Sequence, residues 1–170
     1  MQKYLVNSVG FSRNDATLIS AGTLVLFMFM QPVFGALSDR IGRRPVLMFF
    51  GILGTLCTVP IMLLLQSIAS FWAAFGLVTF ALFILCGYTS INAVVKAELF
   101  PVQIRAIGVG LPYAFTQSVF GGTVEYVGLW FKSIGMESGF FWYIAAGIGC
   151  SLLVYFFMQD TRNTSLIDRD

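Results

Sequence analysis

Five long apolar stretches, separated by short polar loops, limit what this chain of 170 residues can fold into. Each holds roughly 20 or more mostly apolar residues, which is the length that an α-helix needs to cross a bilayer. None of them alternates polar and apolar residues as a membrane β-strand does. We therefore expect five membrane-spanning helices, at residues 17–37, 45–66, 71–97, 104–131 and 138–158.

The composition excludes several other classes of protein. Charged residues make up 11% of the chain, whereas a soluble domain carries about 25%. The net charge of +2 gives no basic face of the kind that binds nucleic acid. The chain has no His, and no Asp lies inside a predicted span, so a membrane-embedded enzyme is disfavoured. We expect no catalytic residue, no metal and no organic cofactor.

Lys and Arg gather in the loops on one side of the predicted spans, which is the side that usually faces the cytoplasm. This side carries Arg40, Arg43, Arg44, Lys96, Arg105, Arg162 and Arg169. The other side carries only Lys3, Arg13 and Lys132. The distribution predicts a cytoplasmic tail at residues 159–170 and an outer location for the first residues of the chain.

The loop at residues 35–44, with the sequence GALSDRIGRR, is the most informative stretch. We expect Gly35 to end one helix and Gly42 to form the turn. The arginines can bridge to carboxylates on a neighbouring bundle. A loop that only sets the topology is the alternative, but the spacing favours a cytoplasmic gate. Its predicted residues are Gly35, Asp39, Arg40, Gly42, Arg43, Arg44, Glu98 and Arg105.

This pattern resembles the signature loop of the major facilitator superfamily, which recurs once in each six-helix half. A second stretch, KAELFP at 96–101 followed by Arg105 and Gly108, resembles the loop between the tenth and eleventh helices of its sugar porters and metabolite:proton symporters. The resemblance implies an all-α integral membrane fold. By this resemblance, the five spans correspond to helices eight to twelve, which form the C-terminal bundle. Residues 1–9 correspond to the end of helix seven. We expect a fragment of a larger transporter, inactive without its N-terminal half.

Four stretches outside these loops are similar to the bacterial members of the metabolite:proton symporter family that carry alpha-ketoglutarate (2-oxoglutarate). They are MQKYLVN at 1–7, GGTVEYV at 121–127, KSIGME at 132–137 and FFWY at 140–143. The resemblance implies symport of this dicarboxylate with a proton, by alternating access, in the bacterial inner membrane. The implied partners are the dicarboxylate, the N-terminal half and the lipid bilayer. Alternatives are a symporter of shikimate, citrate, proline or betaine, a sugar porter, and a non-transporting membrane scaffold.

Transporters of this architecture bind their substrate near the middle of the membrane, between two halves. Polar residues inside the spans are therefore candidates for the cavity wall, although each can also serve as interhelical packing. The predicted cavity residues are Gln31, Tyr88, Asn92, Tyr113 and Gln117. Lys96 follows Tyr88 and Asn92 at four-residue spacing near the cytoplasmic end. There it either extends its amine towards water or takes part in the gate by pairing with Glu98 or with an acidic residue upstream.

Glu125 is the only acidic residue inside a predicted span, which makes it a candidate proton carrier. It also lies only a few residues from the outer surface, so a hydrated carboxylate or an ion pair with an outer Lys or Arg is the alternative. No Arg or Lys lies at mid-depth. Because 2-oxoglutarate carries two carboxylates, we expect its cationic anchors in the N-terminal half.

Overall fold

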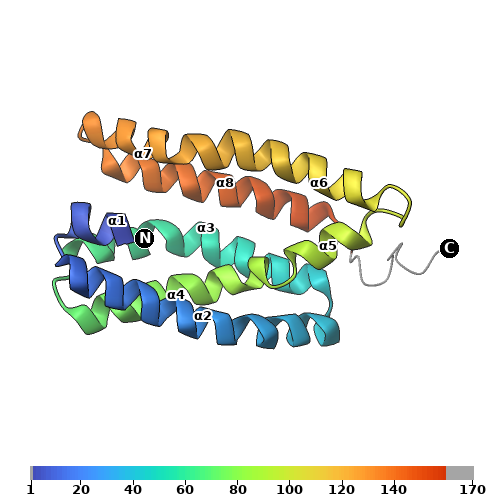
Figure 1. Ribbon diagram of the computed structural model, residues 1–170, viewed down its shortest axis with the longest axis horizontal. Helices are drawn as coiled ribbons and strands as arrows, with labels where there is room; N and C mark the ends of the chain where they lie inside the picture. The colour runs from blue at the N-terminus through green and yellow to red at the C-terminus, as the bar shows by residue number, and fades with distance from the viewer. Residues whose placement is uncertain (1, 160–170) are drawn as a thin grey trace.

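The computed structural model describes residues 2–159, which fold into a bundle of helices lying along one direction (Figure 1). Every regular element in this part of the chain is helical, which confirms the predicted all-α class. The elements are α1 (Gln2–Tyr4), the π-helix η1 (Leu5–Val9), α2 (Arg13–Ile41), α3 (Arg43–Ser67), α4 (Phe71–Thr89), α5 (Asn92–Glu98), α6 (Arg105–Thr116), the π-helix η2 (Gln117–Gly121), α7 (Gly122–Ser133) and α8 (Glu137–Phe157). The predicted tail, with Arg162 and Arg169, lies outside the described residues except for Gln159.

Four helical runs in the described part are long and apolar enough to cross a membrane. They are α2, α3, the run of α4 and α5 at Phe71–Glu98, and α8. The remaining predicted span, at residues 104–131, falls on α6, η2 and α7, which follow one another without a gap. Each of α6 and α7 has only 12 residues, so neither spans alone. Of this run, α7 packs against α8 (Figure 1).

The third predicted span is interrupted at Ser90 and Ile91, where α4 gives way to α5. The hydroxyl of Ser90 donates to the Cys86 carbonyl at 2.6 Å, and the hydroxyl of Thr89 donates to the Leu85 carbonyl at 3.2 Å. Such side-chain bonds to the preceding turn compete with the helical ladder and often bend helices. The break falls directly at two consecutive hydroxyl residues, and the hydrophobic pattern does not reveal it.

The π-turn η2 divides the fourth predicted span five residues after Pro112. Pro112 has no backbone N–H, so it cannot donate to the turn before it. The Thr116 hydroxyl donates to the Pro112 carbonyl at 2.7 Å. Gly121 and Gly122 follow, and glycine is a poor helix former. A π-turn of this kind inserts an extra residue into one turn and is frequent at functional sites.

Helices α3 and α8 make the most extensive contact in the bundle. A Cβ added at Gly51 would lie 2.7 Å from Leu152 Cδ1, and one at Gly54 would lie 3.1 Å from Ile148 Cγ2. Two small residues on one face therefore let these helices approach closely, which is how helices associate in lipid.

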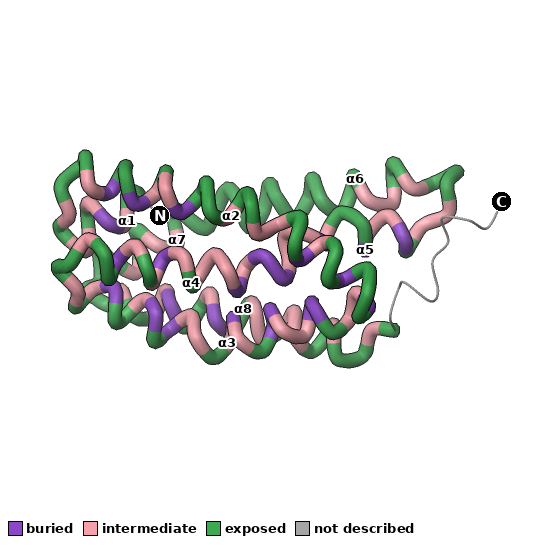
Figure 2. The backbone as a smooth tube through the Cα atoms, turned by 90° about the horizontal axis from the view of Figure 1, so that it is seen from below, coloured by how far each residue is buried: buried purple, intermediate pink, exposed green. Residues whose placement is uncertain are grey.

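The buried core lies in separate clusters along the bundle (Figure 2). At the end that holds the turn between α2 and α3, the rings of Phe34, Phe49 and Phe83 pack with centroids 5.2 to 5.9 Å apart. Large apolar side chains remain exposed outside the core, including Trp72 at 76% and Phe157 at 81%. Residues 110–126, on α6, η2 and the start of α7, are all exposed. Apolar surface on this scale requires lipid or another protein surface to cover it.

Candidate functional site

The two basic loops singled out in the sequence meet at one end of the bundle, where α2 and α5 end and α3 and α6 begin (Figure 1). Arg43 is the centre of this contact. Its Nη1 lies 2.5 Å from Asp39 Oδ1 and 2.8 Å from Ser38 Oγ, and its Nη2 lies 3.4 Å from Glu98 Oε1. The side chains of Arg43 and Glu98 are 12% and 6% exposed, whereas that of Asp39 is 66% exposed. The structure thus brings together three of the predicted gate residues.

Gly42 sets the turn that presents Arg43. Its φ of 102° and ψ of 162° lie in a region that only glycine adopts readily. Its N–H donates to the Ser38 carbonyl at 3.0 Å and closes the end of α2. The prediction for Gly35 was wrong, because α2 continues through Gly35 to Ile41, and a Cβ at Gly35 would meet nothing within 4 Å. A single glycine, with no other helix-breaking residue next to it, is not enough to end an otherwise continuous helix.

The other predicted gate arginines have different surroundings. Arg44 Nη2 donates to the Phe156 carbonyl at 2.5 Å, and its guanidinium lies 6.0 Å from the Phe156 ring centroid. Arg44 therefore links the start of α3 to the end of α8 through this hydrogen bond and ring contact. Arg40 is exposed in the last turn of α2. Arg105 Nε donates to the Phe100 carbonyl at 3.2 Å, and its buried Nη2 has no hydrogen-bond partner within residues 2–159.

A cavity of about 410 Å³ opens between α4, α5 and α6, and we call it the lysine cavity. It is lined by Tyr88, Lys96, Phe100, Gly108, Val109, Pro112, Tyr113, Thr116 and Gln117. Three of the five predicted cavity residues, Tyr88, Tyr113 and Gln117, are thus brought together. Asn92 and Gln31 are half-buried and are not among the lining residues. Asn92 nevertheless contacts the cavity wall, because its side chain is hydrogen-bonded to Tyr88.

Lys96 is not paired with Glu98, and the structure places its amine beside a tyrosine ring. Glu98 contacts Arg43 instead of Lys96, and the Lys96 Nζ lies 4.8 Å from the centroid of the Tyr113 ring. An ammonium at that distance from an aromatic ring is held by a cation–π contact. Spacing along the sequence could not reveal this contact, because it joins two helices.

The candidate proton site, Glu125, lies at the opposite end of α6–α7 from the arginine cluster. Glu125 Oε1 accepts from Lys3 Nζ at 2.5 Å, and the two side chains are 66% and 81% exposed. Lys132 and Glu137 form a second pair at 3.4 Å. All four residues line a cavity of about 380 Å³, the Glu125 cavity. The structure therefore shows the ion-paired arrangement that the sequence left open for Glu125.

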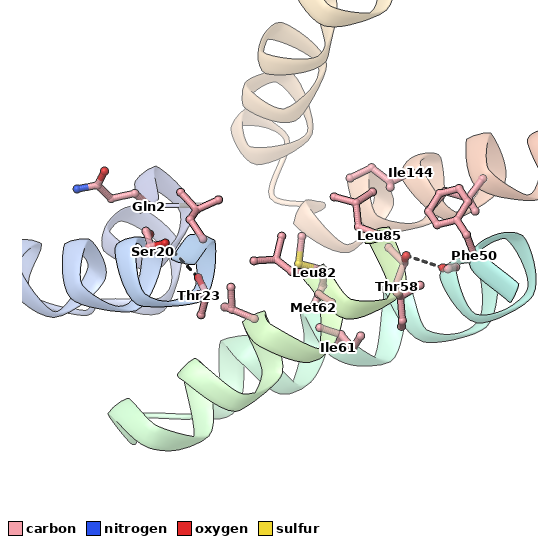
Figure 3. A pocket seen from close by; sticks show the side chains of 16 residues that line it. Gln2, Ser20, Thr23, Phe50, Thr58, Ile61, Met62, Leu82, Leu85 and Ile144 are labelled. Carbon is pink, nitrogen blue, oxygen red and sulfur yellow. Dashed lines mark hydrogen bonds between the residues drawn. The ribbon is translucent and has the colours of Figure 1, made fainter. Parts of the chain in front are cut away.

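A third cavity, of about 530 Å³, lies between α2, α3, α4 and α8 (Figure 3). Its lining is mostly aliphatic and contains no charged residue. The hydroxyls of Thr23 and Thr58 donate to carbonyls of their own helices, at 2.7 and 2.5 Å. The Ser20 hydroxyl in the lining has no hydrogen-bond partner within residues 2–159. No cation lines this aliphatic cavity, however, so nothing in it offsets the cost of burying a dicarboxylate, and it is not a candidate for one.

Comparison with known proteins identifies the family. Residues 1–169 match the family described as the Major Facilitator Superfamily, and the chain belongs to it. The chain is 55% identical over 144 residues to the alpha-ketoglutarate permease of Escherichia coli, covering 85% of this chain and 33% of that protein. It is 32% identical over 170 residues to a glycine betaine/proline/ectoine/pipecolic acid transporter of Dickeya dadantii, covering 98% of this chain and 33% of that protein.

A citrate-proton symporter of Klebsiella pneumoniae is 32% identical over 111 residues, which cover 65% of this chain and 25% of that protein. The chain spans about a third of the length of the first two relatives. No solved structure matches the chain. The family and the apolar helices make it a multi-pass membrane protein.

Proposed function

We propose that this chain forms the C-terminal half of a proton-coupled 2-oxoglutarate symporter that works by alternating access. The 55% identity to an alpha-ketoglutarate permease over 85% of the chain carries this proposal. The relatives at 32% identity carry betaine-type zwitterions or citrate by name. Symport of one of those compounds is therefore the alternative, and 2-oxoglutarate is favoured because its relative is much more similar.

The geometry supports a carrier whose cavity is completed by another half. The lysine cavity is lined by tyrosines, a threonine, a glutamine and a lysine, and polar groups of these kinds fix the orientation of a bound ligand. Its α6 wall is exposed in the described chain. An opposing N-terminal half would cover this wall and supply the remaining cations. The lipid bilayer would cover the apolar surface elsewhere.

The arginine cluster is proposed as the cytoplasmic gate of this carrier. Arg43 and Glu98 join α3 to α5 next to the lysine cavity. An ion pair between two helices can stabilise one of two alternative packing arrangements of those helices. A conformational switch requires an element with two such arrangements. We place this end at the cytoplasmic face of the inner membrane, with the C-terminus inside, because most of the basic residues lie there. Glu125 is proposed as the proton site, and because its pair with Lys3 favours the ionised carboxylate, its protonation requires this pair to open.

The test is uptake of labelled 2-oxoglutarate into proteoliposomes that contain the full-length transporter with these residues. We expect saturable uptake that is driven by an inward proton gradient and collapses when a protonophore is added. Excess unlabelled citrate or betaine should compete poorly with 2-oxoglutarate. Uptake that is the same with and without the proton gradient would contradict symport. Competition by betaine that is stronger than competition by unlabelled 2-oxoglutarate would contradict the proposed substrate. Absence of any uptake supports the non-transporting scaffold. The chain alone, inserted in the same vesicles, should not transport.

A further inference from the structure

Lys96 is a cation within an apolar helical run that could cross a membrane, Phe71–Glu98. Within residues 2–159 it has no acidic partner, because the ion pairs of this part join Lys3, Arg43 and Lys132 to carboxylates. An ionised side chain inside a span is costly, and such residues usually pair or line a route for a charged ligand. Lys96 therefore calls for a counterion that the described part of the chain does not supply.

The direction of the Lys96 side chain shows where that counterion would bind. Its Nζ lies over the ring of Tyr113, which is eight residues into α6 from Arg105. At 1.5 Å per residue this is a depth of about 12 Å along α6. The amine therefore lies beside α6 about two turns from its first residue. The Tyr113 ring holds the amine there without neutralising its charge.

The surroundings of Lys96 fit a carboxylate. The lysine cavity has a volume of about 410 Å³, within the range of small-ligand sites. No Asp or Glu lines it, so no resident anion competes for the ammonium. On the α6 wall Gln117 follows Tyr113 by one turn and lines the cavity beside it. The Gln117 amide and the Tyr88 and Tyr113 hydroxyls can donate to further oxygens of the same ligand.

We propose that the Lys96 ammonium binds one carboxylate of the transported dicarboxylate inside the lysine cavity. This inference rests on the proposed function, and it adds a cationic anchor within this half. The remaining carboxylate would bind to the opposing half. A substrate bridging both halves in this way would couple its own binding to the closure of the cavity.

The experiment measures binding of 2-oxoglutarate to the purified full-length transporter by titration calorimetry. Two monoacids are titrated as well: 2-oxopentanoate, which lacks the distal carboxylate, and 4-oxopentanoate, which lacks the carboxylate beside the keto group. The Lys96→Met variant is compared with Lys96→Arg, which keeps the charge. Arg13→Met is the control, because it removes an exposed cation at the first residue of α2, away from the lysine cavity.

We expect Lys96→Met to weaken 2-oxoglutarate binding about ten- to hundredfold, as loss of a charge-assisted hydrogen bond does. It should weaken only one of the two monoacids, namely the one that retains the carboxylate bound by Lys96. Lys96→Arg should recover most of the affinity, and Arg13→Met should change nothing. Equal weakening of all three ligands indicates a structural role and overturns the proposal, as does unchanged binding.

The titrations distinguish a wrong assignment of the substrate from a wrong assignment of Lys96 as a carboxylate-binding residue. Wild-type protein that does not bind 2-oxoglutarate but binds citrate contradicts the proposed substrate only. The same variants are then titrated with citrate. Weaker citrate binding by Lys96→Met, with recovery in Lys96→Arg, supports the carboxylate anchor. Unchanged citrate binding overturns it, and so does wild-type protein that binds no carboxylate-bearing compound.

Discussion

Arg43 Nη2 lies 3.4 Å from Glu98 Oε1 and joins the first turn of α3 to the last turn of α5, across 55 residues of sequence. Both side chains are largely buried, and Arg43 also holds Asp39 and Ser38. Loss of one partner leaves a buried charge unsatisfied, whereas loss of both can be nearly neutral. This asymmetry makes the pair open to a direct test.

The pair predicts strong coupling in a double-mutant cycle. Glu98→Gln should lower the free energy of unfolding in detergent by about 1–3 kcal/mol, because Arg43 loses its contact with the Glu98 carboxylate. Arg43→Met in the Glu98→Gln background should cost much less than Arg43→Met alone. Thermal unfolding of the four proteins measures the coupling, and additive losses would show that the two side chains do not interact.

Replacement of Asp39 tests the gate itself. The Asp39 side chain is exposed and contacts Arg43, so Asp39→Ala should change stability by less than about 1 kcal/mol. If the contact sets the gate, initial uptake of 2-oxoglutarate should fall about tenfold while the amount of inserted protein stays unchanged. Asp15→Ala, at the other end of α2, is the matched control. Equal uptake by the Asp39 variant and the wild type would argue against the gate.

The backbone at Gly42 predicts an unequal effect of two glycine replacements. Gly42→Ala forces a side chain into a conformation that costs on the order of 1–3 kcal/mol. Gly35→Ala adds a methyl group in open space within a helix, where alanine is favoured by about 0.5–1 kcal/mol. Melting temperatures should therefore move in opposite directions. Equal shifts would contradict the assigned turn.

The close contact of α3 with α8 predicts sensitivity to a single methyl group. Gly51→Ala places a Cβ 3.3 Å from the Leu152 Cα as well as against its side chain, so the helices must move apart. We expect a loss of about 1–3 kcal/mol from overpacking. Gly76→Ala is the control, because a Cβ there meets nothing within 4 Å. Similar melting temperatures for both variants would contradict the packing.

Two loop positions test the orientation of the bundle. Ala69 lies between α3 and α4, and Val102 lies between α5 and α6; both are exposed. In a background without Cys57, Cys86 and Cys150, Ala69→Cys should react with a membrane-impermeant maleimide on intact cells. Val102→Cys should react only after the cells are permeabilised. The reverse pattern would place the arginine cluster outside.

Hydrophobic length was enough to predict most of the helices, because a bilayer requires long apolar runs whatever their tertiary contacts. It did not reveal the break after Thr89 or the π-turn at Gln117–Gly121. Both depend on which carbonyl oxygen accepts the hydrogen bond of a side chain or a backbone N–H. The grouping of Tyr88 with Tyr113 and Gln117 agreed with the sequence-based candidates. The position of the Lys96 amine could not be predicted, because a flexible four-carbon side chain is placed by a neighbouring helix.

The π-turn η2 has a consequence for the direction in which α7 faces. Over the 12 residues from Tyr113 to Glu125, a regular helix turns by about three and a third revolutions, which leaves the two side chains about 120° apart. One extra residue taken up in a widened turn sets the following residues back by about 100°. Tyr113 of the lysine cavity and Glu125 of the Glu125 cavity therefore end close to one line along the helix. Polar side chains from two separate cavities thus share one face of the α6–α7 run, kept in phase by one irregular turn.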